Sequence, residues 1–111
     1  MSKRDAQLLI IDILEAIEKI ERYLTNMSYD SFIKDEKTVD AVIRNFEIIG
    51  EAANQMPKDF TTKYPEIPWR DLSNFRNVLI HAYFGVDLHM VWQIFELDLG
   101  TLKKQLKEIN N

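Results

Sequence analysis

Four side chains able to do chemistry fall within eight residues of this chain: Arg76, Asn77, His81 and Tyr83. A guanidinium binds phosphate through a fixed fork of N–H donors. An imidazole gains or loses a proton near neutral pH. An arginine, an amide, an imidazole and a phenol in this order therefore suit a surface that binds an anion and transfers protons.

The spacing of these residues places them on one arc of an α-helix, which turns by about 100° per residue. With Arg76 at zero, Asn77 lies near 100° and His81 near 140°, while Tyr83 lies near 340°. The remaining arc, from about 200° to 320°, is apolar. It holds Leu72, Phe75, Val78, Leu79 and Ala82. We predict that these five residues form a core stripe and that the polar arc carries the chemistry.

Two long helices precede this segment. Residues 3–26 carry apolar side chains at three- and four-residue spacing, which predicts an amphipathic helix. Ser28 or Asp30 can cap a short helical turn that contains Phe32 and Ile33. A second long helix is predicted from about Lys37 to Met56 and ends at Pro57.

Gly50 lies inside the second long helix, where it costs up to about 1 kcal/mol relative to alanine. We interpret it as a site of close helix packing. Residues 57–68 contain all three prolines and predict a loop, with room for one helical turn at residues 58–63.

The segment with the reactive side chains is predicted to form a helix from Trp69 to about Tyr83, broken by Gly85. Asp87 then caps a last helix that runs to about Ile109. No segment shows the alternating pattern of a strand. We predict an all-α fold: one domain over residues 1–111, an antiparallel four-helix up-and-down bundle with a short extra helical turn.

Composition excludes several classes of function. The chain has no cysteine, which rules out disulfides and thiol chemistry, and its net charge of −4 opposes broad binding to nucleic-acid backbone. No signal peptide or membrane span is visible, so we expect a cytoplasmic protein without membrane contact. The two histidines are not spaced as metal ligands and no glycine-rich phosphate loop is present, so we expect no metal and no cofactor.

Other polar and aromatic residues have plainer interpretations. Trp69 and Trp92 fall on apolar stripes and are expected in the core or in an interface. His89 is expected to face solvent. The cluster of Lys103, Lys104 and Lys107 is interpreted as a solvated helix end.

Arg44 and Glu51 lie two turns apart on the second long helix. An exposed helix face is the first interpretation of this pair. The alternative is that Glu51 or Glu47 holds Arg76 in position across the bundle.

The motif Arg-Asn-x-x-x-His-x-Tyr at residues 76–83 resembles the signature of HEPN-domain proteins. The surrounding blocks are similar to those of the HepT-like branch, the toxin half of a toxin–antitoxin pair. They are Ile49-Gly50-Glu51-Ala52-Ala53, Tyr64-Pro65-Glu66-Ile67-Pro68-Trp69 and Tyr83-Phe84-Gly85-Val86-Asp87. The resemblance therefore extends over most of the chain.

This resemblance implies a HEPN-like homodimer that cleaves RNA without a metal, through attack of the ribose 2′-hydroxyl. It implies Arg76 and His81 as catalytic residues at a dimer cleft, and Asn77 is a candidate to support them. It further implies a cognate nucleotidyltransferase antitoxin, for which Tyr83 is the candidate AMPylation site. The alternative is a catalytically silent helical bundle that binds substrate or acts as a scaffold for a nucleotidyltransferase.

Overall fold

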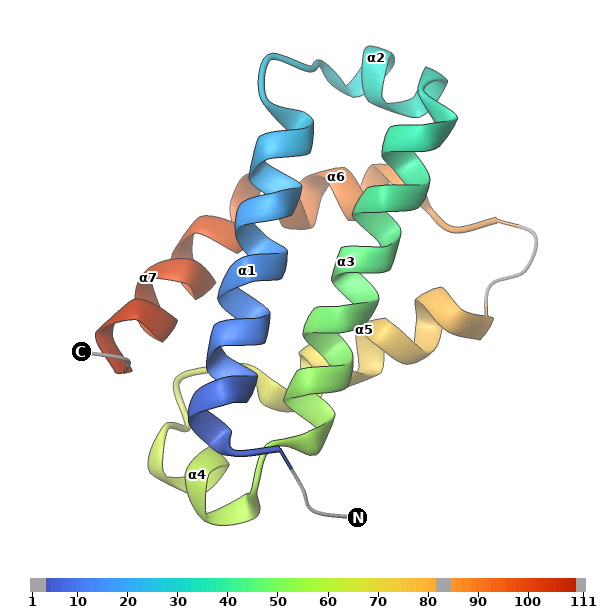
Figure 1. The fold of residues 1–111 in the computed structure, drawn as a ribbon. Helices are drawn as coiled ribbons and strands as arrows, with labels where there is room; N and C mark the ends of the chain where they lie inside the picture. Colours follow the sequence, from blue (N-terminus) through green and yellow to red (C-terminus); the bar gives the residue numbers. More distant parts are fainter. Residues whose placement is uncertain (1–3, 82–84, 110–111) are drawn as a thin grey trace.

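The computed structural model describes residues 4–81 and 85–109, and these residues form helices joined by short connections (Figure 1). The helices are α1 (Ala6–Leu24), α2 (Tyr29–Lys34), α3 (Glu36–Gln55), α4 (Lys58–Lys63), α5 (Trp69–His81), α6 (Leu88–Leu97) and α7 (Leu99–Ile109). No strand occurs in these two ranges. The predicted all-α, HEPN-like fold is confirmed, including the helical turn predicted at residues 58–63.

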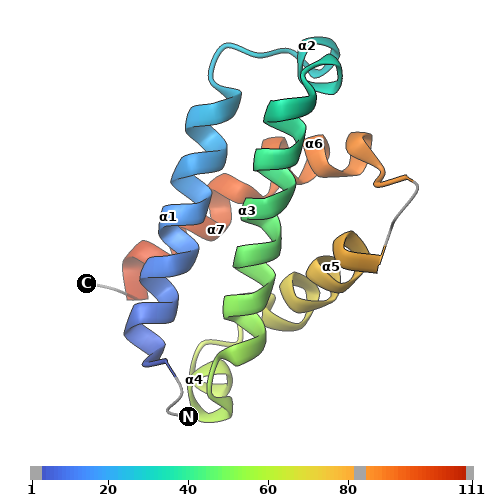
Figure 2. The same cartoon turned by 45° about the vertical axis from the view of Figure 1, so that its right-hand side comes forward.

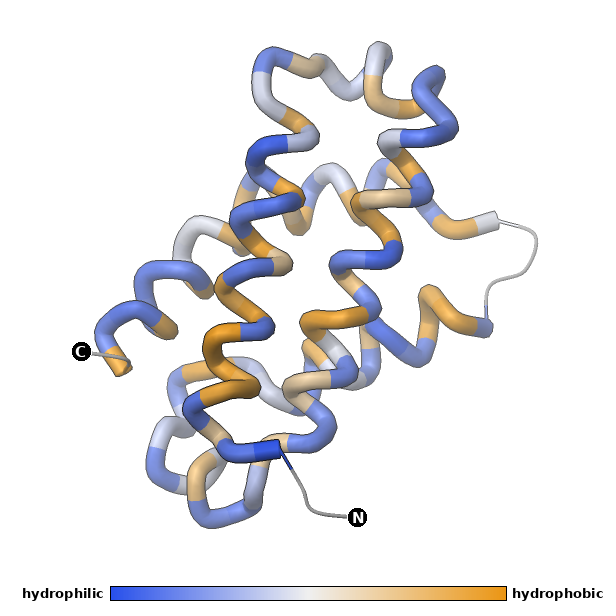
Figure 3. Tube along the Cα trace, in the orientation of Figure 1, coloured by the Kyte–Doolittle hydropathy of each residue, from blue (hydrophilic) through white to orange (hydrophobic). Residues whose placement is uncertain are grey.

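Helix α3 is the centre of the bundle. It lies antiparallel to α1 on one side and is crossed by α5 on the other, and both contacts are extensive (Figures 1 and 2). Apolar and polar positions alternate along α1 and α3, as expected for helices with one face toward a core (Figure 3). The fully buried side chains of this core include Ile10, Ile13, Ile17, Val42 and Ile49.

Short polar side chains fix where the helices begin. The carboxylate of Asp87 accepts the amide of Met90 at the start of α6, as predicted. Ser28 and Ser31 cap α2 reciprocally. Asp35 caps α3 by accepting the amide of Thr38, and this hydrogen bond lowers the pKa of the Asp35 carboxyl.

The predicted single helix from Asp87 to Ile109 is wrong in one respect, because it is broken at Asp98. Asp98 ends α6, and α7 begins at the next residue in a different direction (Figure 2). Asp98 and Gly100 are both weak helix formers, so the break costs little. It allows α6 to contact α2 while α7 contacts α1.

Two corrections to single residues follow from this arrangement. Lys103 is no solvated helix end, since its ammonium lies 2.8 Å from a carboxylate oxygen of Glu21 on α1. The hydrogen bond to Glu21 raises the pKa of Lys103. The tryptophans behave as predicted: Trp69 and Trp92 are each only 8% exposed.

Within the two described ranges, no helix is both long enough and apolar enough to cross a lipid bilayer.

Candidate anion-binding site on helix α5

Helix α5 packs against α3 through part of the predicted apolar stripe. Leu79 is buried, Leu72 and Phe75 are half-buried, and the Phe75 ring meets the Phe46 ring of α3 edge-on at 5.5 Å. Val78 contradicts the prediction, because its side chain is 53% exposed. It lies at the edge of the apolar arc, where α3 does not reach. Ala82, the last member of the predicted stripe, lies outside the described residues.

Gly50 is where α3 and α5 come closest. A methyl group at Gly50 would collide with the Cβ of Arg76 and would lie 2.6 Å from the backbone carbonyl oxygen of Leu72. The two helix backbones can approach to this distance only because Gly50 has no side chain. The prediction that Gly50 serves close packing is confirmed. This contact sets the position of Arg76 relative to α3.

The Arg76 guanidinium is held by two neighbours. One nitrogen lies 2.7 Å from a carboxylate oxygen of Glu51, and another donates a hydrogen bond of 2.8 Å to the side-chain oxygen of Asn77. The Arg76 side chain is 27% exposed. A guanidinium has five N–H donors, so three remain after these contacts. The fixed and partly exposed fork can still bind a phosphate oxygen.

Glu51 follows Gly50 directly, which explains why its carboxylate reaches Arg76. Of the two interpretations of this face of α3, the structure supports the contact with Arg76. Glu47 makes no such contact and instead lies 3.6 Å from the guanidinium of Arg44. Arg44 itself is a surface cation, as the first interpretation predicted.

His81 is the last residue of α5, and its side chain is exposed. In the described part of the chain, the structure records no hydrogen bond or ion pair for this imidazole. Asn77 precedes His81 by four residues on the same exposed face, although its recorded hydrogen bond goes to Arg76. Tyr83, the candidate modification site, lies outside the described residues.

Two apolar side chains flank this exposed polar face, and sequence reasoning did not single them out. Val78 is 53% exposed and Ile80 is 39% exposed, on either side of the Asn77 and His81 positions. The signal was present in the helical spacing, which puts Ile80 on the polar arc at about 40°. The face therefore combines a histidine, an amide and two large apolar groups in contact with solvent.

Taken together, an all-α bundle and a crossing helix with arginine and histidine five residues apart define a HEPN-like protein. Comparison with known proteins narrows this class. The family model described as "Ribonuclease HepT-like" matches residues 13–109. The chain belongs to the HepT-like ribonuclease family.

Relatives of similar length lead to the same family. A protein of Thermococcus cleftensis named "Probable ribonuclease HepT" is 44% identical over 107 residues, which cover 96% of this chain and 97% of the relative. A protein of Methanocaldococcus jannaschii that is provisionally named an RNase is 40% identical over 109 residues, which cover 98% of this chain and 90% of the relative. No solved structure matches the chain.

Proposed function

We propose that this protein is a metal-independent endoribonuclease and the toxin of a HEPN/nucleotidyltransferase toxin–antitoxin pair. The observation that carries the proposal is the orientation of Arg76 by Glu51 and Asn77, on the same helix as an exposed His81. Membership of the HepT-like ribonuclease family gives these two residues an RNA phosphodiester as their target.

RNA supplies its own nucleophile in the proposed reaction. The 2′-oxygen loses its proton and bonds to the adjacent phosphorus, the bond from phosphorus to the 5′-oxygen breaks, and that oxygen takes up a proton. The products are a 2′,3′-cyclic phosphate and a 5′-hydroxyl. His81 transfers protons, a contribution worth roughly 10² to 10⁴ in rate. Arg76 stabilises the negative charge of the pentacovalent transition state.

The in-line reaction needs a base on one side and an acid on the other, whereas each chain offers one histidine at this face. A homodimer meets the need, because a two-fold axis beside α5 brings two Arg76 and two His81 side chains into one cleft. The exposed Val78 and Ile80 support such a contact. Large apolar groups beside the polar centre gain free energy when a second subunit covers them.

Control by the partner follows from the position of Tyr83, two residues beyond His81. We propose that a cognate nucleotidyltransferase antitoxin attaches AMP to the phenol of Tyr83. Each added phosphate brings negative charge to the edge of the cleft, where it repels the RNA backbone.

Glu51 has a positioning role in this proposal, and its replacement gives a testable result. Glu51→Ala frees the Arg76 side chain, so we expect kcat to fall about tenfold, equivalent to about 1.4 kcal/mol in the barrier. Stability should change by less than about 1 kcal/mol, because the ion pair is partly exposed. The measurement is kcat and KM on a fixed RNA substrate, together with a melting curve.

Glu47→Ala is the matched control, since Glu47 lies one turn away and pairs with the exposed Arg44. It should leave kcat within about twofold, a change of about 0.4 kcal/mol in the barrier. Equal losses in the two variants would show that this face of α3 acts through general charge and not through Arg76.

The proposed activity itself is tested by incubating the purified protein with total tRNA in excess chelator. We expect cleavage that resists the chelator and products that end in a cyclic phosphate. Cleavage that requires a divalent metal, or products with 5′-phosphates, would contradict the mechanism. Intact RNA at every protein concentration would favour the silent scaffold of a nucleotidyltransferase instead.

A further inference from the structure

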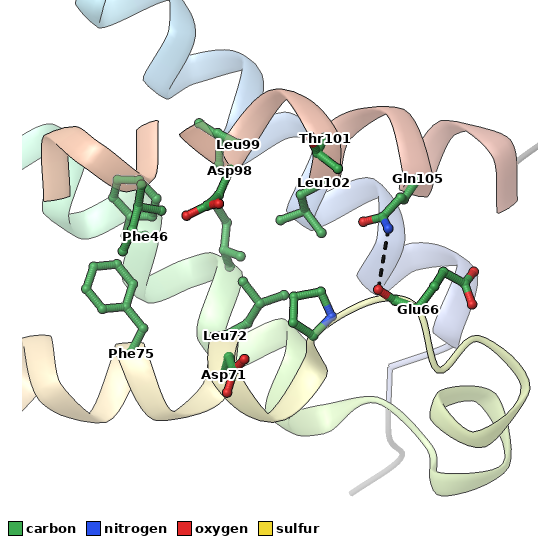
Figure 4. Close-up of a pocket in the computed structure, with 13 residues that line it drawn as sticks. Phe46, Glu66, Asp71, Leu72, Phe75, Asp98, Leu99, Thr101, Leu102 and Gln105 are labelled. Carbon is green, nitrogen blue, oxygen red and sulfur yellow. Dashed lines mark hydrogen bonds between the residues drawn. The ribbon is translucent and has the colours of Figure 1, made fainter. Parts of the chain in front are cut away.

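A pocket separates α5 from the junction of α6 and α7 (Figure 4). Its volume is about 420 Å³. It exists because α5 packs on α3 while α7 packs on α1, so α5 makes only sparse contact with α6 and α7. Side chains from all four of the helices α3, α5, α6 and α7 line it.

The floor of the pocket is apolar. Phe46 and Ile49 of α3 and Leu99 and Leu102 of α7 are buried side chains that line it, and the half-buried Phe75 ring forms one wall. A surface of this kind gains free energy when it is removed from water, at about 25 cal/mol per Å². A ligand with an apolar body is therefore favoured.

The mouth of the pocket is acidic. Asp71 of α5 and Asp98 at the junction of α6 and α7 lie on opposite sides of the apolar floor, and Glu66 lies at one end (Figure 4). None of the residues that line the pocket is a lysine, an arginine or a histidine. In the described part of the chain, none of these three carboxylates is in an ion pair. Their combined charge attracts a cation.

The pocket faces away from the proposed catalytic residues. On the wheel of α5, its lining residues Asp71, Leu72 and Phe75 lie between about 220° and 320°. His81 lies near 140° and Asn77 near 100°, on the exposed face of the same helix. A ligand in this pocket would not occupy the face proposed for RNA.

The charge also decides between possible occupants. Nucleic acid is disfavoured because its phosphates would meet the carboxylates. A second copy of the chain placed here by a two-fold axis is disfavoured because it would bring Asp71 and Asp98 against the same carboxylates of the partner copy. The volume falls in the range of about 300 to 1,000 Å³ that is typical of small-molecule sites.

We propose that this pocket is a binding site for a small organic cation with an apolar body. The apolar part lies against Phe46, Phe75 and Leu102, and the ammonium or guanidinium group lies at the mouth between Asp71 and Asp98. This site is separate from the proposed catalytic face, and it does not depend on the proposed ribonuclease activity.

The test is a titration of the isotope-labelled full chain, followed by the backbone amide resonances. The probes are phenethylamine, its neutral analogue phenethyl alcohol and the anionic hydrocinnamate. We expect phenethylamine to shift the resonances of the lining residues saturably, and to bind about tenfold more tightly than the alcohol, because two partly exposed carboxylates contribute. Hydrocinnamate should bind least.

Variants locate the site. The double variant Asp71→Asn/Asp98→Asn should bind the amine and the alcohol equally, while Asp59→Asn, on the exposed α4, should keep the preference. Thr101→Trp at the exposed rim should fill the pocket and abolish binding of both probes. Equal binding of amine and alcohol to the unmodified chain, shifts centred elsewhere, or no saturable shift would each overturn the proposal.

Discussion

His81→Ala should lower the rate of RNA cleavage by roughly 10² to 10⁴-fold, because it removes the group proposed to move protons to and from the ribose and phosphate oxygens. The fold should be unaffected. His81 is exposed at the end of α5 and makes no recorded hydrogen bond within the described residues, so its loss leaves no cavity and no unpaired buried group. The measurement is single-turnover cleavage of a labelled RNA, with a melting curve alongside.

His89→Ala is the matched control, since His89 is the other histidine of the chain and is also exposed. It packs edge-on against the Tyr29 ring at 5.6 Å, far along the chain from the α5 motif. Its cleavage rate should stay close to that of the unmodified protein. An active His81→Ala protein, or equal losses in the two variants, would contradict the assignment of proton transfer to His81.

Gly50→Ala should destabilise the fold by about 2 kcal/mol, which corresponds to a fall in melting temperature of roughly 6 to 10 °C for a domain of this size. The added methyl group collides with the Arg76 Cβ and approaches the Leu72 carbonyl oxygen at 2.6 Å. Backbone atoms cannot rotate away as a flexible side chain can, so α5 must move off α3. The gain in helix propensity, up to about 1 kcal/mol, offsets only part of the cost.

Gly100→Ala provides the comparison, because a methyl group there would meet nothing within 4 Å. We expect it to be neutral or to stabilise α7 by up to about 1 kcal/mol. Chemical denaturation of both variants separates the two effects. A Gly50→Ala protein as stable as Gly100→Ala would show that α3 and α5 do not pack backbone to backbone.

Most of the fold could be predicted from the sequence, because local signals mark it. Pro57 ends α3, the caps at Ser28 and Asp87 start their helices, and Trp69 begins α5. The break at Asp98 could not be predicted in this way. The apolar repeat continues across it, and only the different packing partners of α6 and α7 separate the two helices.

The site was predicted less completely than the fold, for a physical reason. A helical wheel gives the direction of Val78 but not the width of the surface that covers it, so its exposure depends on how far α3 extends over α5. The ion pair between Glu51 and Arg76 depends on the close crossing at Gly50, and therefore on tertiary structure. The pocket between α5 and α7 depends on the spacing of three helices, which no local pattern encodes.

The shared cleft is tested most directly by a mixed dimer that contains one Arg76→Ala subunit and one His81→Ala subunit. The two variants are co-expressed with different tags, and the mixed dimer is isolated by both. If the guanidinium and imidazole groups of two subunits act in one cleft, the mixed dimer retains one of each, and it should cleave RNA faster than the two variant homodimers combined. Cleavage no faster than that of the separate variants would show that each subunit depends on its own Arg76 and His81, and would contradict the shared site.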